Sequence, residues 1–181
     1  ARDCPLPNVS NEELENLVSP WIAKRHHDVE VDHDSVAWKL NPTKEELHRM
    51  RAYYYANVEM IDNQLGNILN SLEERGNMDN TIVIFTSDHG DNLGDHGLIQ
   101  KWAPYEEVTR VPLIISAPKR FKSGRNISAM VQLFDLAPTI LEWAGVKPNP
   151  TFEAVSLNSA LEGSKFDGRD HVFCEQAGDV N

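Results

Sequence analysis

The sequence is poor in cysteine and in cationic residues. Its 181 residues include only two cysteines, Cys4 and Cys174. Two cysteines in a chain of this length form neither a disulfide scaffold nor a paired-cysteine zinc site. Lysine and arginine total 17 against 28 aspartates and glutamates, so the formal net charge is -11. Because an acidic surface repels nucleic acid and anionic membranes, we expect neither as a partner.

Long hydrophobic runs are also lacking. The longest apolar runs, 81–85 and 111–117, are far too short to cross a bilayer. The first residues carry neither the basic start nor the apolar stretch of a signal peptide, and the chain does not begin with Met. We therefore expect an internal or processed piece of a longer protein. The sequence leaves the compartment open between a secreted, periplasmic or lysosome-like location, which we favour, and the cytoplasm.

What is present is an ordinary globular composition, with 40% hydrophobic and 25% charged residues, which argues against disorder. Near the N-terminus, Ser10 and Glu13 form a capping box that predicts a short helix over 11–18, ended by Pro20. The following segment, 26–34, is polar and lacks helical periodicity, so it is predicted to be a loop.

A second capping box, Thr43 with Glu46, opens the best-determined element of the sequence. Behind it, apolar residues recur at steps of three and four from Leu47 to Leu72, which predicts one long amphipathic helix. Gly76 stands where a C-terminal cap belongs.

Two β-branched runs predict strands. The run 81–86 is typical of a strand buried on both faces, and 111–115 reads as a second strand. The other expected elements are a helix at 136–144 with Asp135 as its N-cap, a short helix at 156–162 and the start of a strand at 171–175. Helices that alternate with buried strands indicate an α/β fold with a mostly parallel sheet, in one domain.

The loop after the first strand carries side chains that suit a metal. Functional groups collect beyond the carboxyl ends of strands in open α/β sheets. Asp88 and His89 offer an oxygen and an imidazole nitrogen together, and Lys101 is a cation that could meet an anionic oxygen. A tight turn and a solvated lysine explain the same residues, so both interpretations stay open at this point.

The wider string of motifs resembles the sulfatase family, which belongs to the alkaline-phosphatase-like superfamily. The resemblance spans 43–161, and the segments that carry it are 54–62, 86–97, Lys101, 105–115 and 135–141. It implies that 1–181 is part of a sulfatase catalytic domain, a slice of a mostly parallel sheet flanked by helices. The nucleophile-bearing N-terminal half and the C-terminal subdomain would lie outside this chain.

The resemblance also implies roles for single residues. Asp88 and His89 match the metal ligands from the second half of the family's site, and Lys101 matches the catalytic lysine that contacts the sulfate oxygens. The implied metal is divalent, calcium by family default and manganese as the alternative.

Other polar residues are expected to have lesser roles. Glu106, Glu107 and Arg110 match a recurrent family stretch and are expected to orient the loop, while His96 is expected to be structural. The histidines and aspartates of 26–34 fit no standard ligand spacing. We interpret that segment as a solvated loop at the rim of the site, where it would help to select the substrate.

The nucleophile is missing from the 181 residues. The resemblance implies a formylglycine made from Cys or Ser in a Cys/Ser-x-Pro/Ala-x-Arg motif, and neither Cys4 nor Cys174 has an Arg at the required place. The family's Asp-Asp ligand pair and the His that assists the leaving group are not matched either. We expect all of these upstream, so the isolated chain is predicted to be inactive.

The function that the resemblance implies is hydrolysis of a small-molecule or carbohydrate sulfate ester by a divalent metal and formylglycine. Two alternatives stay open. One is a phosphonate monoester hydrolase or phosphodiesterase of the same superfamily, and the other is a non-catalytic metal-binding relic or interaction protein. The identity of the ester, the metal and the oligomeric state are not determined by the sequence.

Overall fold

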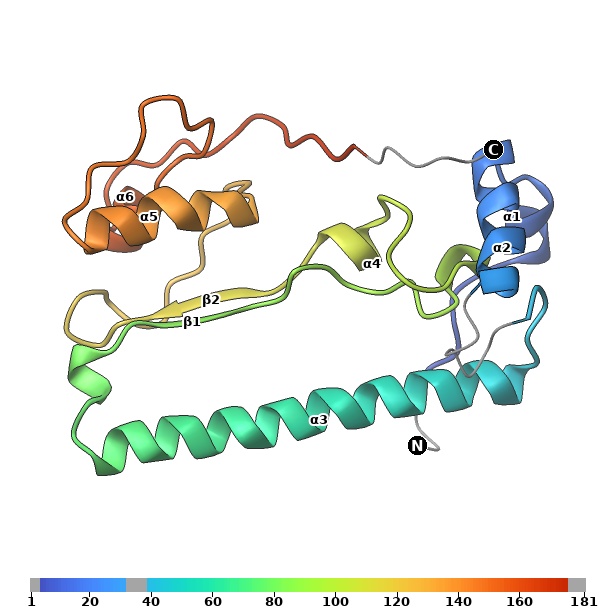
Figure 1. Cartoon of the computed structure of the whole chain (residues 1–181), viewed down its shortest axis with the longest axis horizontal. Helices are drawn as coiled ribbons and strands as arrows, with labels where there is room; N and C mark the ends of the chain where they lie inside the picture. Colours follow the sequence, from blue (N-terminus) through green and yellow to red (C-terminus); the bar gives the residue numbers. More distant parts are fainter. Residues whose placement is uncertain (1–3, 32–38, 176–181) are drawn as a thin grey trace. The chain divides into compact units, whose positions relative to one another are not determined.

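The structure, a computed structural model, describes residues 4–31 and 39–175 (Figure 1). The chain forms two compact units. The first contains Ala1–Ser71, His89–Pro112 and Glu175–Asn181, and the second contains Leu72–Asp88 and Leu113–Cys174. Among the described residues, no helix is both long enough and apolar enough to cross a membrane.

The first unit opens with helix α1 (Asn11–Glu15). Its start confirms the first capping box, because Ser10 Oγ accepts a hydrogen bond from the Glu13 N–H at 3.0 Å. The helix ends at Glu15, earlier than the sequence predicts, because the Asn16 N–H turns back to the carbonyls of Glu12 and Glu13.

The predicted loop over 26–34 is wrong as far as the structure describes it, because helix α2 (Ser19–Val31) runs through its first six residues. Pro20 lies in the first turn of this helix, where its missing N–H would have had no intrahelical partner, so it starts a helix instead of ending one. Tertiary contacts fix α2 as well: Arg25 donates to the carbonyls of Gly97 at 2.9 Å and Leu40 at 2.7 Å. The rest of the predicted loop lies outside the described residues.

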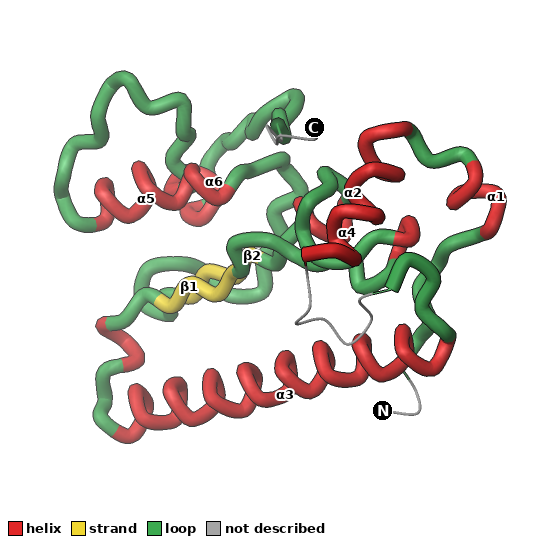
Figure 2. Tube along the Cα trace, turned by 45° about the vertical axis from the view of Figure 1, so that its right-hand side comes forward, coloured by secondary structure: helices red, strands yellow, loops and turns green. Residues whose placement is uncertain are grey.

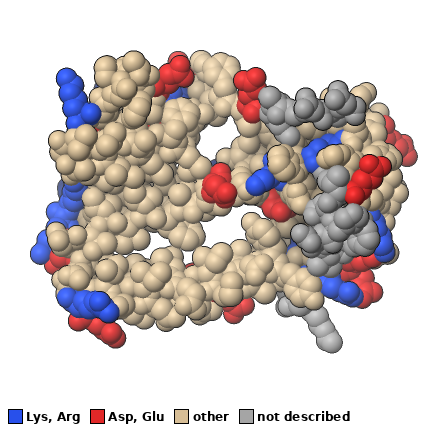
Figure 3. Space-filling view, in the orientation of Figure 1, with Lys and Arg blue, Asp and Glu red and all other residues tan. Residues whose placement is uncertain are grey.

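Helix α3 (Lys44–Glu74) confirms the long amphipathic helix and its capping box. The Glu46 N–H donates to Thr43 Oγ1 at 3.2 Å, and the Thr43 N–H donates to Glu46 Oε2 at 2.8 Å. At the other end, Gly76 has φ +66° and its N–H donates to the Glu73 carbonyl, which ends the helix as predicted. Figure 2 shows α3 as one continuous helix, and Figure 3 shows a largely uncharged surface along it.

In the second unit, strand β1 (Val83–Thr86) pairs with strand β2 (Leu113–Ser116). The pairing is antiparallel, with Val83 opposite Ser116 and Thr86 opposite Leu113. The sequence predicted a mostly parallel sheet without assigning this pair, and the one pair among the described residues is antiparallel. Parallel neighbours need a crossover, usually a long helix, whereas the segment between these strands contains only short helical turns. β1 is half-buried along its whole length, and in β2 half-buried residues alternate with exposed ones such as Ile114, which is 61% exposed, so the predicted burial on both faces was also wrong.

The second unit also contains helix α5 (Leu136–Trp143) and helix α6 (Asn158–Glu162), which confirm the two helices expected there. Asp135 does not cap α5 with its side chain. It ends the preceding 3-10 helix η3 (Leu133–Asp135), where its carboxylate accepts the Gln132 N–H at 2.8 Å. The expected strand at 171–175 is absent from these described residues, and the nearby chain makes a single bridge between Met130 and Arg169.

A buried polar centre holds these helices together. Asp135 is 1% exposed, and it accepts hydrogen bonds from the Val155 N–H at 2.7 Å and from Arg169 Nη2 at 2.5 Å. Thr139 Oγ1 links the two helices, because it donates to the Asp135 carbonyl at 2.6 Å and accepts the Leu157 N–H at 2.8 Å. Every one of these groups has a partner, which offsets the cost of burying it.

Candidate metal and sulfate site

The predicted metal ligands follow β1 directly. Asp88 is exposed, and its Oδ1 accepts a hydrogen bond from Ser87 Oγ at 3.4 Å. His89 is half-buried, and its Nδ1 lies 2.7 Å from the Gly90 carbonyl oxygen. A carbonyl only accepts, so Nδ1 carries the proton and the lone pair of the neutral ring is on Nε2. Metal-binding histidines are oriented in this way, with the second ring nitrogen donating to a carbonyl.

Gly90 fixes the position of this loop against helix α4 (Glu106–Thr109). The Gly90 N–H donates to the Val108 carbonyl at 2.8 Å. A Cβ at this position would lie 1.8 Å from the Glu107 carbonyl oxygen, so no other residue fits without moving the backbone.

The loop closes on itself just before Lys101. Asn92 is fully buried, and both its N–H and its Nδ2 donate to the Gln100 carbonyl, at 2.9 and 2.7 Å. Asp91 Oδ1 accepts the N–H groups of Leu93 at 2.8 Å and of Gln100 at 3.1 Å. These bonds bring Gln100 back to the start of the loop and thereby fix the backbone from which Lys101 extends.

Lys101 is exposed, and its Nζ lies 5.6 Å from the centroid of the Trp102 ring. In the part of the chain that the structure describes, no carboxylate forms an ion pair with it. A second cation, Lys24 of α2, lies 5.2 Å from the same centroid. Trp102 Nε1 donates to Gln100 Oε1 at 2.7 Å, which orients the ring.

His96 lies in the 3-10 helix η2 (Asp95–Gly97) with a φ of +57°. Its Nδ1 lies 2.6 Å from Glu13 Oε1, its Nε2 lies 3.4 Å from Glu107 Oε2, and its ring stacks on Tyr105 with the centroids 3.8 Å apart. Burial raises the pKa of Tyr105, and the carboxylates of Glu13 and Glu107 raise it further. These contacts connect α1, the loop and α4, which agrees with the structural role predicted for His96.

A buried ion pair holds the loop against α3. Arg51 is 7% exposed; its Nη2 lies 2.5 Å from Asp95 Oδ2, and its Nε donates to the Leu93 carbonyl at 3.0 Å. Asp95 Oδ1 also accepts the Asn8 N–H at 2.6 Å. Local residue spacing does not predict this pair, because Arg51 and Asp95 are 44 residues apart.

The described residues do not form a complete metal site. Among the described residues, no group of three or more His, Cys, Asp or Glu side chains could hold a metal ion. The chain also passes from the second unit to the first between Asp88 and His89, and Lys101 belongs to the first unit. Their joint role as a site therefore stays a prediction.

The other polar residues that the sequence singled out lie away from Asp88, His89 and Lys101 along the chain. Glu106 and Arg110 form an exposed pair with 3.3 Å between Oε2 and Nη1, one helical turn apart. His26 and His27 are exposed on α2, and the other candidates of that segment have no described side chain.

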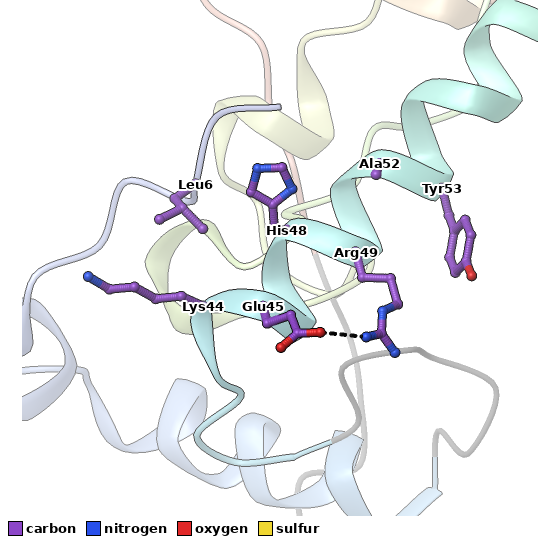
Figure 4. A pocket seen from close by; sticks show the side chains of 7 residues that line it. All are labelled: Leu6, Lys44, Glu45, His48, Arg49, Ala52 and Tyr53. Carbon is purple, nitrogen blue, oxygen red and sulfur yellow. Dashed lines mark hydrogen bonds and ion pairs between the residues drawn. The ribbon is translucent and has the colours of Figure 1, made fainter. Parts of the chain in front are cut away.

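A surface pocket over the first turns of α3 contains none of the predicted site residues (Figure 4). It is lined by Leu6, Lys44, Glu45, His48, Arg49, Ala52 and Tyr53.

Known proteins resemble this chain in sequence. The family model described as Sulfatase matches residues 18–146. An N-acetylglucosamine-6-O-sulfatase of Bacteroides thetaiotaomicron is 45% identical over 109 residues, which are 60% of this chain and 20% of that protein.

Solved structures resemble it in fold. The phosphonate monoester hydrolase of Silicibacter pomeroyi has a TM-score of 0.77 and 28% identity over 90% of this chain and 32% of that one. A structure in complex with D-glucosamine-2-N,6-O-disulfate has a TM-score of 0.66 and 40% identity over 70% of this chain and 26% of that one. These matches confirm the α/β, alkaline-phosphatase-like fold class, and they show that the chain spans a third or less of the length of these relatives.

The family match covers more than half of the chain and includes the loop with Asp88, His89 and Lys101. The relatives agree with it in sequence and in fold. The chain therefore belongs to the sulfatase family.

Proposed function

We propose that the chain forms one half of the active site of a sulfuric ester hydrolase. Asp88 and His89 would hold one side of a divalent metal, and Lys101 would contact the sulfate. The formylglycine nucleophile and the other ligands would lie upstream in a longer protein. The observation that carries the proposal is His89, whose Nδ1 is 2.7 Å from the Gly90 carbonyl oxygen and whose Nε2 therefore has the lone pair that a metal needs.

The metal is proposed to be calcium, with manganese as the alternative. Calcium prefers oxygen ligands such as the Asp88 carboxylate, whereas an imidazole ligand also suits transition metals. When bound, such an ion polarises the S–O bond and stabilises the charge that develops on oxygen.

Lys101 would add positive charge at the sulfate group. A cation held against the peripheral oxygens in a site closed to water contributes on the order of 3 kcal/mol to transition-state stabilisation. The need for such a cation is clear from the charge of the whole chain, -11, which by itself repels an anionic ester.

The substrate is proposed to be a sulfated carbohydrate. A sequence match named as an N-acetylglucosamine-6-O-sulfatase and a structure solved with a disulfated glucosamine support this class. A secreted, periplasmic or lysosome-like location fits such a substrate and is proposed with it.

A second candidate function has a specific observation in its favour. The Silicibacter pomeroyi phosphonate monoester hydrolase matches 90% of this chain with a TM-score of 0.77. Because a phosphonate ester is also a tetrahedral anion, the same metal ligands and lysine would serve its hydrolysis.

Manganese-induced line broadening in NMR tests the metal half-site directly, because it detects weak binding by two ligands. We expect Mn²⁺ to broaden the amide signals of Asp88, His89 and Gly90 in the 181-residue chain. The double variant Asp88→Asn, His89→Ala is expected to lose this broadening. Broadening centred instead on α2, and removed by His26→Ala with His27→Ala, would contradict the assignment.

Activity is tested by a segment exchange. Residues 43–161 of this chain would replace the matching segment of the Bacteroides N-acetylglucosamine-6-O-sulfatase, which supplies the missing nucleophile. The chimera is expected to hydrolyse glucosamine 6-sulfate, and Lys101→Ala is expected to lower kcat about 100-fold or more. Lys147→Ala removes an exposed lysine after α5 and is expected to change nothing. A preference for phenyl phosphonate monoesters over sulfates would favour the second candidate function.

A further inference from the structure

His96 lies between two carboxylates that belong to different helices. Its Nδ1 is 2.6 Å from Oε1 of Glu13, on α1, and its Nε2 is 3.4 Å from Oε2 of Glu107, on α4. The ring also stacks on Tyr105, with the two ring centroids 3.8 Å apart. All four residues belong to the first unit. One imidazole ring therefore connects two helices through both of its nitrogens.

Both contacts are favourable together only when the ring carries a positive charge. A carboxylate only accepts hydrogen bonds, and a neutral imidazole has one N–H and one lone pair. A neutral ring therefore serves one of the two carboxylates and turns its lone pair toward the other. The imidazolium has an N–H on each nitrogen and attracts both carboxylates. Histidine in general gains or loses this charge between about pH 5 and pH 8.

The two glutamates act jointly on the space around His96. After burial, their charges are the causes that raise the pKa of Tyr105, the residue on which the His96 ring stacks. The other charged groups recorded near the ring, on its own turn and on α2 and α4, have partners of their own. They are Asp95 with Arg51, Arg25 with the Gly97 carbonyl, and Glu106 with Arg110. Charge on the His96 ring is thus balanced by Glu13 and Glu107.

Helix α4 connects this contact to a predicted metal ligand. The carbonyl oxygen of Glu107 is the atom that leaves no room for a Cβ at Gly90. The next carbonyl of the helix, that of Val108, accepts the Gly90 N–H at 2.8 Å. The Gly90 carbonyl oxygen in turn lies 2.7 Å from Nδ1 of His89. A change in the attraction between His96 and Glu107 therefore reaches the backbone that orients the His89 ring.

We propose that His96 is a positioning residue, whose protonated ring ties α1 to α4 and thereby holds Gly90 and His89 in place. Loss of the proton weakens this hold, so the loop is fixed more firmly at mildly acidic pH than at pH 8. The coupling follows from contacts within the first unit. Its consequence for a bound metal rests on the proposed function of His89.

Hydrogen exchange of the Gly90 amide, measured by NMR on the metal-free 181-residue chain, tests this coupling. The protection factor is recorded from about pH 5, above which carboxylates are ionised, to about pH 8.5. The ring signals of His96 and His89 are followed in the same samples. We expect protection to fall about two- to fivefold as the His96 ring loses its proton, which corresponds to the loss of one partly exposed ion pair.

Two variants remove the coupling, and each has a matched control. His96→Asn cannot titrate in this range, and Asn tolerates the left-handed backbone of this position, where φ is +57°. Glu107→Gln removes the charge on α4 and keeps the shape of the side chain. Both are expected to make the protection of Gly90 independent of pH. His171→Asn, in the second unit, and Glu106→Gln, at the neighbouring position of α4, remove exposed groups and should leave the pH dependence in place.

The outcomes separate this inference from the proposed function. Protection that does not change with pH in the wild-type chain would overturn it, and so would a change that survives in His96→Asn or Glu107→Gln. A change that follows the ring signals of His89 would overturn it as well. Because no metal is added, absent Mn²⁺ broadening at His89 would overturn the proposed metal role alone. Protection independent of pH in a chain that does bind Mn²⁺ there would overturn only the coupling.

Discussion

At the scale of single residues, the described structure is organised by buried charges that have several partners each. Asp135 is the clearest case. Burial by itself would raise its pKa, but hydrogen bonds from Arg169 and from the N–H groups of Val155 and Gln132 outweigh burial, and the pKa lies below its usual value. The ionised carboxylate therefore stabilises the folded state above the pKa of the unfolded chain, and this contribution is lost as the pH falls through the lower folded pKa.

Replacement of Asp135 tests this account. Asp135→Asn leaves Arg169 without its carboxylate, so we expect the free energy of unfolding to fall by about 3 kcal/mol at pH 7. As the pH falls from the unfolded pKa of Asp through the lower folded pKa, the difference between wild type and variant should shrink, because protonation removes the charge that pairs with Arg169. Urea denaturation at several pH values measures both effects. Asp167→Asn is a suitable control, because its 3.1 Å pair with Lys165 is exposed and should matter little.

At position 90, the neighbouring backbone leaves room for glycine but not for a side chain. A Cβ there would meet the Glu107 carbonyl at 1.8 Å, so Gly90→Ala must displace the loop that carries His89. We expect a loss of about 2 kcal/mol in the free energy of unfolding. Gly66→Ala, in α3 with nothing within 4 Å of the new Cβ, should instead stabilise the chain by about 1 kcal/mol. Equal effects of the two variants in urea denaturation would contradict this prediction.

At the scale of elements, the capping residues at the N-terminus of α3 determine where this helix begins. Hydrogen bonding from Lys39 is the main reason that the pKa of Glu46 is lowered to about 2, and hydrogen bonds from Thr43 add to it. The Glu46 carboxylate thus supports the capping box above the unfolded pKa near 4.5, and this support disappears as the pH falls through about 2.

The pH dependence of helix content tests the role of this cap. We expect the circular dichroism signal at 222 nm to weaken between about pH 4.5 and pH 2 in the wild-type chain. Glu46→Gln keeps the cap but cannot titrate, so the part of the transition that belongs to this residue should be lost. Glu45→Gln removes an exposed carboxylate that pairs with Arg49 at 2.8 Å, and it should leave the transition in place.

At the scale of the whole molecule, the chain carries the residues proposed to bind sulfate and metal but no formylglycine motif. Neither Cys4 nor Cys174 lies in a formylglycine motif. Metal ligands and a lysine stabilise a transition state but do not form the covalent intermediate.

We therefore expect the purified 181-residue chain to show no turnover of p-nitrocatechol sulfate, with or without added calcium or manganese. The assay is a colorimetric measurement at high protein concentration, with the segment-exchange chimera as the positive control. Turnover by the isolated chain that is lost in Lys101→Ala would show that a nucleophile within these residues had been overlooked.

The sequence by itself determined the elements whose signals are local. The capping boxes Ser10/Glu13 and Thr43/Glu46, the β-branched run of β1 and the glycine after α3 all act within a few residues. Asp88, His89 and Lys101 were predicted in the same way, because family motifs are contiguous strings, and their role as a site stays a prediction.

Only the tertiary structure decided the features that depend on distant partners. It made 26–31 helical, through contacts of α2 with Gly97 and Leu40, and it paired β1 with β2 in antiparallel order. It also brought Arg51 to Asp95, Arg169 to Asp135 and Lys24 to Trp102. Residue spacing does not predict such pairs, because the free energy that stabilises them comes from burial and charge between segments distant in sequence. Neighbours along the chain do not contribute it.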